Sequence, residues 1–313
     1  MAIKELKVFV GSAHKEFGEE VCRYLGIEPG RSKVSRFRDG ELKVKIEENV
    51  RGVDTFIIQP TLPPGDNIIE LLLFIDALKR ASARRITAVI PYYGYARQDR
   101  KDEPRVPISA RLMADLLTVA GASRVLALDL HADQIQGFFS IPVDNLNAIP
   151  VYVEYLKSVN IKDAVVVAPD IGSANKARNF ARSIGQFEIA IVDKRREKAN
   201  EAKAFHLVGN VEGKHAIIFD DIIDTGGTLL EASRVLKENG AVSIWCIATH
   251  AILSGNAVDK LNDSYIENII VTNSLPIREK ITEKFTILSI AHLMGEAIRR
   301  IHNEESISSL FII

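Results

Sequence analysis

The stretch FDDIIDTGGT, residues 219–228, combines three aspartates with two glycines that lie between threonines. It follows the apolar run 216–218, so Asp220 and Asp221 are predicted to lie at the carboxyl end of a buried strand. The glycines precede a helical pattern, and backbone N–H groups at a helix start can bind an anion such as phosphate. Carboxylates can accept hydrogen bonds from sugar hydroxyls. A sugar phosphate suits both halves of the stretch, whereas a TGGT alone would indicate an ordinary turn capped by threonine.

Two further clusters carry cations or a tight turn. Residues 96–109, ARQDRKDEPRVPIS, follow an apolar run and contain Arg97, Arg100, Lys101 and Arg105. This segment is either a solvated charged loop or a cationic lip that binds a polyphosphate through bidentate arginine contacts. Residues 36–42, RFRDGEL, predict a hairpin with its turn at Asp39 and Gly40.

Two other clusters could bind a metal or close over a substrate. In DLHAD, residues 129–133, His131 lies between two acids at a predicted strand end and is either a structural histidine or a metal ligand. Asp170 could supply an oxygen to the same cation, and Mg²⁺ typically takes only one or two protein ligands beside substrate phosphates. DKRRE, residues 193–197, is either a flexible charged loop or a mobile flap over a phosphoryl-transfer site.

Short apolar runs predict the strands that position these clusters. Their β-branched content and lack of polar alternation indicate strands buried on both faces, as in parallel sheets. The runs are 6–10, 55–59, 86–90, 124–129, 164–170, 188–193, 216–221, 243–250 and 269–273. Helical patterns alternate with them, including 67–81, with Asn67 and Glu70 in capping-box spacing, and 228–239, which ends at Gly240. The alternation predicts an α/β fold with ligands at the carboxyl ends of the strands.

The chain length and an internal echo predict two similar domains. A length of 313 residues suits two domains of about 150 residues each. RVLALDLHADQIQGFF and HAIIFDDIIDTGGTLL share the order of strand, acid, further acid, small residues and helix. We therefore predict an N-terminal domain over 1–147, a C-terminal domain over 148–300 and a tail over 301–313 that packs back on the N-terminal domain.

Composition excludes several classes of protein. Lys and Arg number 40 against 41 Asp and Glu, so no overall charge indicates a nucleic-acid or anionic membrane partner. No apolar run reaches the roughly 18 residues of a membrane span, and the N-terminus does not read as a signal peptide. Cys22 and Cys246 lie far apart in patterns that predict buried thiols, which indicates a reducing, cytoplasmic location.

Together the clusters resemble the ribose-phosphate diphosphokinases (phosphoribosyl diphosphate synthetases) of the Mg²⁺- and phosphate-dependent class. FDDIIDTGGT alone resembles a loop that these enzymes share with type I phosphoribosyltransferases, so it does not separate the two groups. FRDGE, YARQDRK, DLHADQIQGFF, VDKRR and the final SxSxLF at 306–311 appear in the family's order over essentially the whole chain. The resemblance implies two phosphoribosyltransferase-type domains, each with a mainly parallel sheet flanked by helices, and a homohexamer.

The resemblance also implies a reaction, in which the β,γ-diphosphate of ATP moves onto O1 of ribose 5-phosphate and AMP leaves. The residues expected to bind ATP are Phe37, Asp39, Gly40, Glu41, Arg97 and Gln98. The residues expected to bind ribose 5-phosphate are Asp220, Asp221, Asp224, Thr225, Gly226, Gly227 and Thr228. His131 and Asp170 are expected to bind Mg²⁺. Lys194 and Arg196 are expected to stabilise transition-state charge from a flexible catalytic loop.

Two segments depart from the family pattern. The family reads D-x-G-G-x-x-R after the acid at 170, but this chain has Ser173 and Lys176 at the second glycine and the arginine. We expect altered binding at this diphosphate-side loop without loss of activity, because serine lacks glycine's backbone freedom and lysine lacks arginine's fork. Asn49 replaces a serine of the regulatory segment, a departure that bears on activation by phosphate and inhibition by ADP. The residues that match the regulatory site are Arg51, Lys101, Asp102, Arg105, Ser306, Ser308 and Phe311.

Two other functions stay open at this point. One is a non-catalytic regulatory homologue, which the presence of His131, Lys194 and Arg196 disfavours. The other is a phosphoribosyltransferase, which would lack the FRDGE and ARQD segments. Formation of AMP from ATP and ribose 5-phosphate would separate all three.

Overall fold

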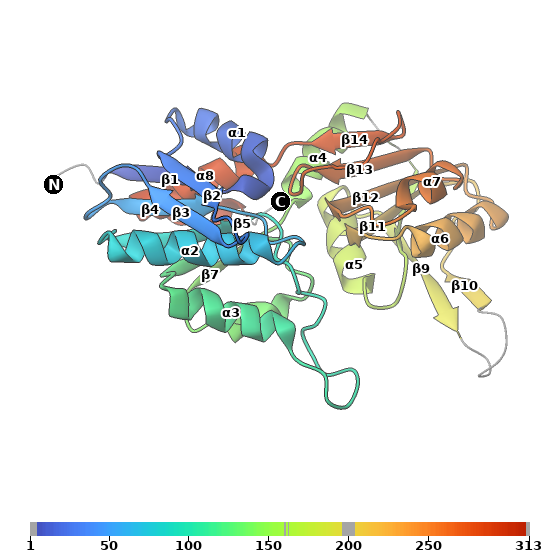
Figure 1. Ribbon diagram of the computed structural model, residues 1–313. Coiled ribbons are helices and arrows are strands. Elements are labelled where there is room, and N and C mark those ends of the chain that lie inside the picture. Colours follow the sequence, from blue (N-terminus) through green and yellow to red (C-terminus); the bar gives the residue numbers. More distant parts are fainter. Residues whose placement is uncertain (1–4, 160, 162, 196–203, 311–313) are drawn as a thin grey trace. The chain divides into compact units, whose positions relative to one another are not determined.

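The computed structural model describes residues 5–159, 161, 163–195 and 204–310. The chain forms two compact units, shown in Figure 1. Unit 1 comprises residues 1–147, 274–276 and 290–312, and unit 2 comprises residues 148–273 and 277–289. Residues 290–300 therefore belong to unit 1 and not to the C-terminal domain predicted from the sequence. The reason is that helix α8 (Ala291–Asn303) packs on α1 (Lys15–Leu25).

Unit 1 is built on a sheet of five parallel strands in the order β1-β4-β5-β6-β7. The strands are β1 (Leu6–Val10), β4 (Asp54–Ile58), β5 (Arg85–Ile90), β6 (Arg124–Leu128) and β7 (Val143–Leu146). Helices α2 (Asp66–Arg80) and α3 (Ser109–Ala120) cover one face, and α1 and α8 cover the other (Figure 1). The core under α2 joins Phe9 and Ile57 from the sheet with Phe74 from the helix, all fully buried. Burial on both faces explains why these strands read as apolar runs.

The predicted capping box of α2 is wrong. The amide of Asn67 donates to the carbonyl of Leu62 at 2.8 Å, outside the helix. The carboxylate of Glu70 accepts from the backbone N–H of Ser12 at 2.6 Å and also from the Ser12 hydroxyl. Glu70 is buried, so its hydrogen bonds hold the loop after β1 against the helix instead of capping the helix start.

The predicted hairpin is confirmed as an antiparallel pair of strands, β2 (Ser32–Arg36) and β3 (Leu42–Ile46). Gly40 has a φ of 99°, which glycine adopts without a side-chain penalty. The carboxylate of Asp39 accepts from the N–H of Glu41 at 3.1 Å and tightens the turn. Arg36 at the end of β2 pairs with Asp66 of α2 at 2.7 Å, so the hairpin lies against that helix.

Unit 2 contains a sheet in the order β10-β9-β8-β11-β12-β13-β14, parallel except for the β9–β10 pair. Its strands are β8 (Ala164–Ala168), β9 (Glu188–Arg195), β10 (Ala204–Val208), β11 (His215–Ile223), β12 (Ser243–Ala251), β13 (Asn268–Thr272) and β14 (Phe285–Leu288). Helices α4 (Ile149–Val159) and α5 (Ala174–Ser183) cover one face. The other face packs on α6 (Gly227–Glu238) and α7 (Ala257–Asn262). The predicted α/β fold is confirmed.

The predicted strands all occur, and no end is shifted by more than two residues. The sequence did not predict β7, β10 and β14, which form edges of the two sheets. An edge strand has a neighbour on only one side and tolerates polar residues, as in VDNL of β7. In the described part of the chain, no helix has both the length and the apolar character needed to cross a membrane.

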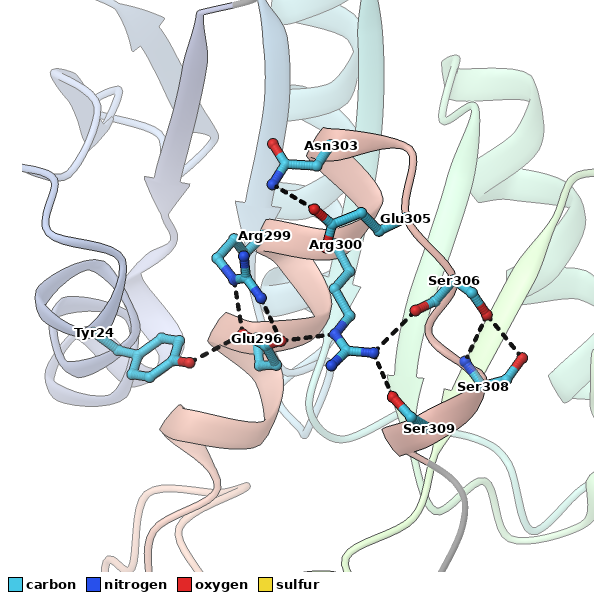
Figure 2. Close-up of polar contacts among 9 residues, drawn as sticks. All are labelled: Tyr24, Glu296, Arg299, Arg300, Asn303, Glu305, Ser306, Ser308 and Ser309. Atoms are coloured by element: carbon cyan, nitrogen blue, oxygen red, sulfur yellow. Dashed lines mark hydrogen bonds and ion pairs between the residues drawn. The ribbon is translucent and has the colours of Figure 1, made fainter.

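A polar network on α8 joins this helix to α1 and to the C-terminal segment, as Figure 2 shows. The carboxylate of Glu296 accepts from the Tyr24 hydroxyl at 3.0 Å and from Arg299 at 2.8 and 2.7 Å. It also accepts from Arg300 at 2.7 Å, and Arg300 in turn donates to the carbonyl of Ser306 at 3.0 Å. One carboxylate thus holds residues from α1 and α8 together.

This network predicts a specific acid sensitivity. The hydrogen bonds from Arg299, then those from Arg300 and Tyr24, lower the pKa of Glu296 from 4.5 to about 2. Since the folded state prefers the ionised form, the stabilisation is complete above pH 4.5 and is lost as the pH falls towards 2. Glu296→Gln removes the titration, so its stability should fall less than the wild type's between these values. Urea unfolding at pH 6 and pH 3 measures the difference, and equal losses would contradict the assignment.

Candidate active site

The acidic stretch that opened the sequence lies at the end of β11. This strand pairs with β8 on one side and β12 on the other, and it continues through the two aspartates to Ile223. Phe219 fixes the position of this strand. Its ring stacks on Phe180 of α5, with 4.2 Å between the ring centroids, and meets Tyr152 of α4 edge-on, with 6.3 Å between the centroids. The aspartates are therefore held where the strands reach their carboxyl ends, and buried aromatic contacts anchor this position. We call the carboxyl ends that carry Asp170, Asp220 and Asp221 the acidic edge.

The carboxylates of Asp170, Asp220 and Asp221 act on one another at this edge. Burial, followed by the charge of Asp221, raises the pKa of Asp220 well above its ordinary value, and the charge of Asp170 adds to the effect. Asp221 is buried, with 7% of its side chain exposed, and forms an ion pair with Lys176 of α5 at 3.0 Å. The gathering of three carboxylates at these strand ends favours the binding of a further cation.

Oxygen ligands of this type suit Mg²⁺, which binds through one or two carboxylates and substrate phosphates. Among the described residues, no group of three or more His, Cys, Asp and Glu side chains has the arrangement of a metal site. A site completed by substrate phosphates does not need such a group. The residues at this edge therefore fit a magnesium ion that arrives with a phosphorylated substrate.

The turn from Asp224 to Thr228 leads into α6 and is anchored from behind. Ser254 donates its N–H to the carbonyl of Asp224 at 3.1 Å. Lys260 of α7 donates to the carbonyl of Thr225 at 3.2 Å. Gly226 has a φ of 72° and precedes the first residue of the helix, Gly227. The turn combines a fixed backbone with a helix N-terminus, which is the arrangement that binds phosphate groups.

The two glycines of the turn differ in a way that stability measurements can detect. Gly226 is in the left-handed region, and an added Cβ would lie 3.4 Å from the carbonyl of Ala257, whereas a Cβ on Gly227 would meet nothing within 4 Å. Gly226→Ala should lower the free energy of unfolding by roughly 1–2 kcal/mol. Gly227→Ala is the matched control and should leave stability unchanged or slightly raised. Urea unfolding of both variants is the measurement, and an equal loss in both would contradict this account of the turn.

The loop after β8 is organised by Asp170 and the unexpected serine. The N–H and the hydroxyl of Ser173 donate to the Asp170 carboxylate at 2.8 and 3.0 Å. Ser173 has a φ of −86°, which any residue adopts, so the expected cost of replacing a glycine here does not arise. The substitution instead gives the carboxylate of Asp170 a hydroxyl donor that glycine lacks.

In unit 1 the structure brings the 96–109 segment and the 129–133 segment together. Gln134, just after DLHAD, donates from its side-chain amide to the carboxylate of Asp99 at 2.7 Å. The hydroxyl of Ser109 donates to the side-chain oxygen of Gln98. The backbone N–H of Ala110 donates to the backbone carbonyl of Gln98 at 3.2 Å. Gln98 therefore lies close to the start of α3. His131, after β6, is partly exposed in the same unit.

The hairpin presents its turn outward. Phe37 has 51% of its surface exposed, and the ammonium of Lys43 lies 5.3 Å from the ring centroid. An exposed aromatic ring with a cation over one face can stack on a base. The predicted role of this turn in binding adenine stays a prediction.

The predicted regulatory residues are exposed where the structure describes them. The side-chain oxygen of Asn49 accepts from the N–H of Arg51 at 3.1 Å, so it holds the local turn. Arg105 has a φ of 68° in the exposed loop 101–105. The hydroxyls of Ser306 and Ser308 lie 3.0 Å apart near Arg300 (Figure 2). Phe311 lies outside the described residues.

The predicted catalytic cations lie at or beyond the limit of the described residues. The backbone of Lys194 is part of β9 and pairs with Phe205 of β10, but its side chain is not described. Arg196 lies outside the described residues. Residues 193–195, expected in a flexible loop, are therefore the end of a strand, because their backbone pairs with β10. β9 lies next to β8 and hence in the same sheet as the acidic end of β11.

Sequence reasoning missed two site lysines. Lys176 appeared in the sequence only as a departure from the family's D-x-G-G-x-x-R pattern. Its contact with Asp221 joins residues that are 45 positions apart in the chain. Lys260 lies in a short helix whose six residues carry no recognisable motif. For Lys176, a basic residue in the first turn of a helix that follows an acidic strand end was the available signal.

Comparison with known proteins shows the family of this chain. A model described as the N-terminal domain of ribose phosphate pyrophosphokinase matches residues 6–121. A model described as the phosphoribosyl synthetase-associated domain matches residues 191–312. A ribose-phosphate pyrophosphokinase of Wolinella succinogenes is 50% identical over 307 residues, which cover 98% of this chain and 99% of that protein. The chain belongs to the ribose-phosphate pyrophosphokinase family.

Other members of the ribose-phosphate pyrophosphokinase family give the same result. One from Vibrio cholerae is 51% identical over 311 residues, covering 98% of this chain and 99% of the relative. The crystal structure of phosphoribosylpyrophosphate synthetase from Mycobacterium smegmatis matches with a TM-score of 0.91 and 43% identity, covering 96% of this chain and all of that one. The resemblance drawn from the sequence is confirmed. The chain is an enzyme of this pyrophosphokinase family, which acts on small molecules.

Proposed function

We propose that the chain transfers the diphosphoryl group of ATP to O1 of D-ribose 5-phosphate, which gives 5-phosphoribosyl 1-diphosphate and AMP for nucleotide biosynthesis. The observation that carries this proposal is the end of β11, where Asp220 and Asp221 precede an anchored glycine turn. A sugar phosphate satisfies both features, and membership of the ribose-phosphate pyrophosphokinase family supports the reaction.

In this proposal unit 2 binds ribose 5-phosphate. The backbone N–H groups of the turn 224–228 and its threonine hydroxyls bind the 5-phosphate. The partly exposed carboxylate of Asp220 accepts hydrogen bonds from the ribose hydroxyls, and Asp221 supports it. Unit 1 binds ATP through Phe37 and its hairpin turn and through the Arg97–Gln98 segment.

The chemistry is the attack of the sugar O1 on the β-phosphorus, with cleavage of the bond to the oxygen that leaves with AMP. Such a transfer needs in-line placement of the two substrates and neutralisation of the charge that develops. Asp170 of unit 2 and His131 of unit 1 are each proposed as ligands of Mg²⁺, which would supply Lewis-acid charge neutralisation when bound. Lys194 and Arg196 stabilise the negative charge on the transferring group.

We further propose a homo-oligomer, in keeping with the hexamer implied by the family resemblance. The outer face of α3 supports this, because Leu112, Leu116 and Val119 lie on one side of the helix at 52%, 37% and 77% exposure. Exposed apolar residues at helical spacing are suited to burial against another protein surface. Light scattering of the purified protein tests this, and a monomeric mass would contradict it.

The buried thiols of Cys22 and Cys246 are consistent with the cytoplasmic location that we infer.

Release of AMP tests the function directly. The enzyme should form AMP from ATP only when ribose 5-phosphate and Mg²⁺ are present, in a coupled assay at varied phosphate and ADP. Activation by phosphate and inhibition by ADP in the same assay would support the regulatory assignments. Absence of AMP under all of these conditions would reject the synthetase reaction and leave a regulatory homologue.

A further inference from the structure

We infer that Lys176 is a positioning residue for the pentose phosphate, which it serves by holding Asp221 in place through their ion pair. This inference rests on the proposed function of unit 2, and it concerns a lysine to which that proposed function gives no role. The ammonium of Lys176 lies 3.0 Å from a carboxylate oxygen of Asp221. Lys176 is partly exposed at 32%, while the carboxylate is nearly enclosed at 7%.

The register of α5 on β11 brings the two residues together. Lys176 and Phe180 are four residues apart and therefore lie on the same side of the helix. Phe219 and Asp221 are two residues apart in the strand and lie on the same face of the sheet. Phe180 stacks on Phe219 at 4.2 Å, so the ion pair continues the contact that the aromatic rings begin. The buried stack fixes the geometry of the pair.

Charge explains why the site needs this lysine. Three carboxylates, those of Asp170, Asp220 and Asp221, interact at the edge that receives a dianionic phosphate ester. Without Lys176, Asp221 would keep an enclosed carboxylate with that counter-charge removed, and its side chain would move from its present position. The ion pair therefore keeps Asp221 aligned, so that Asp220 can accept hydrogen bonds from the sugar.

The effect should be selective for one substrate. Lys176 lies in unit 2 with the acidic edge, whereas the residues proposed for ATP lie in unit 1. We expect Lys176→Met to raise the KM and the Kd for ribose 5-phosphate about 10- to 100-fold, the range of one charge-assisted hydrogen bond. The KM for ATP should change less than about threefold, a difference well below one such hydrogen bond. Lys176→Arg keeps the charge and should restore most of the affinity.

The experiment combines turnover with a direct binding measurement. Calorimetry of ribose 5-phosphate with the full-length wild type and with Lys176→Met measures binding even if turnover is absent. A wild type that binds the sugar phosphate but forms no AMP would reject the proposed reaction and still test the role of Lys176. Lys214→Met is the matched control, because it removes a 2.7 Å ion pair with Glu188 at the opposite end of β11. This control should keep normal affinity.

A double-mutant cycle separates action through Asp221 from a direct contact with the substrate. If Lys176 acts through Asp221, Lys176→Met should have little further effect in an Asp221→Asn background. Additive effects on binding would overturn the inference, as would equal rises in the KM values of both substrates. Unchanged affinity for ribose 5-phosphate in Lys176→Met would overturn it as well.

Discussion

Replacing Lys194 with alanine should lower kcat for AMP formation about 10²- to 10³-fold while the KM for ATP stays near normal. A cation that contacts the transferring group stabilises charge that exists mainly in the transition state, so its loss lowers kcat more than it weakens ground-state binding. The expected loss corresponds to about 3–4 kcal/mol of transition-state stabilisation. Steady-state kinetics with both substrates varied is the measurement.

Lys237→Ala is the matched control for this variant. Lys237 is an exposed lysine in the last turn of α6, so its removal changes the net charge equally and leaves the segment of Lys194 unaltered. The Lys237→Ala variant should keep wild-type turnover. If Lys194→Ala also turns over at the wild-type rate, Lys194 has no part in the mechanism.

The largest expected effect on stability is at Asp54, at the start of β4. Its carboxylate is 2% exposed and accepts from both Nε and Nη2 of Arg85, the first at 2.8 Å. His302 of α8 lies 2.9 Å from the same carboxylate, and Arg85 also donates to the carbonyl of Ile301 at 2.9 Å. The hydrogen bond to Asp54 raises the pKa of Arg85, which keeps the guanidinium charged. These contacts join α8 to β4 and β5 of the sheet.

Asp54→Ala should therefore lower the free energy of unfolding by about 3 kcal/mol, because it leaves the largely enclosed Arg85 without its carboxylate. Urea unfolding gives the stability, and hydrogen exchange should show reduced protection in β4 and α8. Asp76→Ala is the control: it breaks an exposed pair with Arg80 and should cost less than about 0.5 kcal/mol. A similar small cost for Asp54→Ala would mean that the buried network contributes little to holding α8.

The strands were predictable from the sequence wherever burial on both faces left an apolar run. AVVVA of β8 and HAIIF of β11 are examples, since neighbours on either side exclude polar residues from them. The assignment of α8 was not predictable in this way. That helix returns to unit 1 through contacts such as His302 with Asp54, which are 248 residues apart in the chain. Local patterns carry no information on such distant partners.

The acidic end of the site was equally readable, because strand, acids and glycines are contiguous. The difference in environment between Asp220 and Asp221 was not predictable from the sequence. Asp221 faces Lys176 and is enclosed, whereas Asp220 keeps partial exposure. The capping-box error at Glu70 has the same origin. A side chain with a suitable local partner bonded instead to Ser12, 58 residues away.

The measurement that tests the central claim most directly follows the β-phosphorus of ATP. With ATP labelled at that position by radioactive phosphorus, ribose 5-phosphate and Mg²⁺, the label should appear in a sugar 1-diphosphate, and the nucleotide product should be unlabelled AMP. Label recovered in ADP would instead show transfer of the γ-phosphoryl group alone. That result, or label that stays in ATP, would contradict the proposed diphosphoryl transfer.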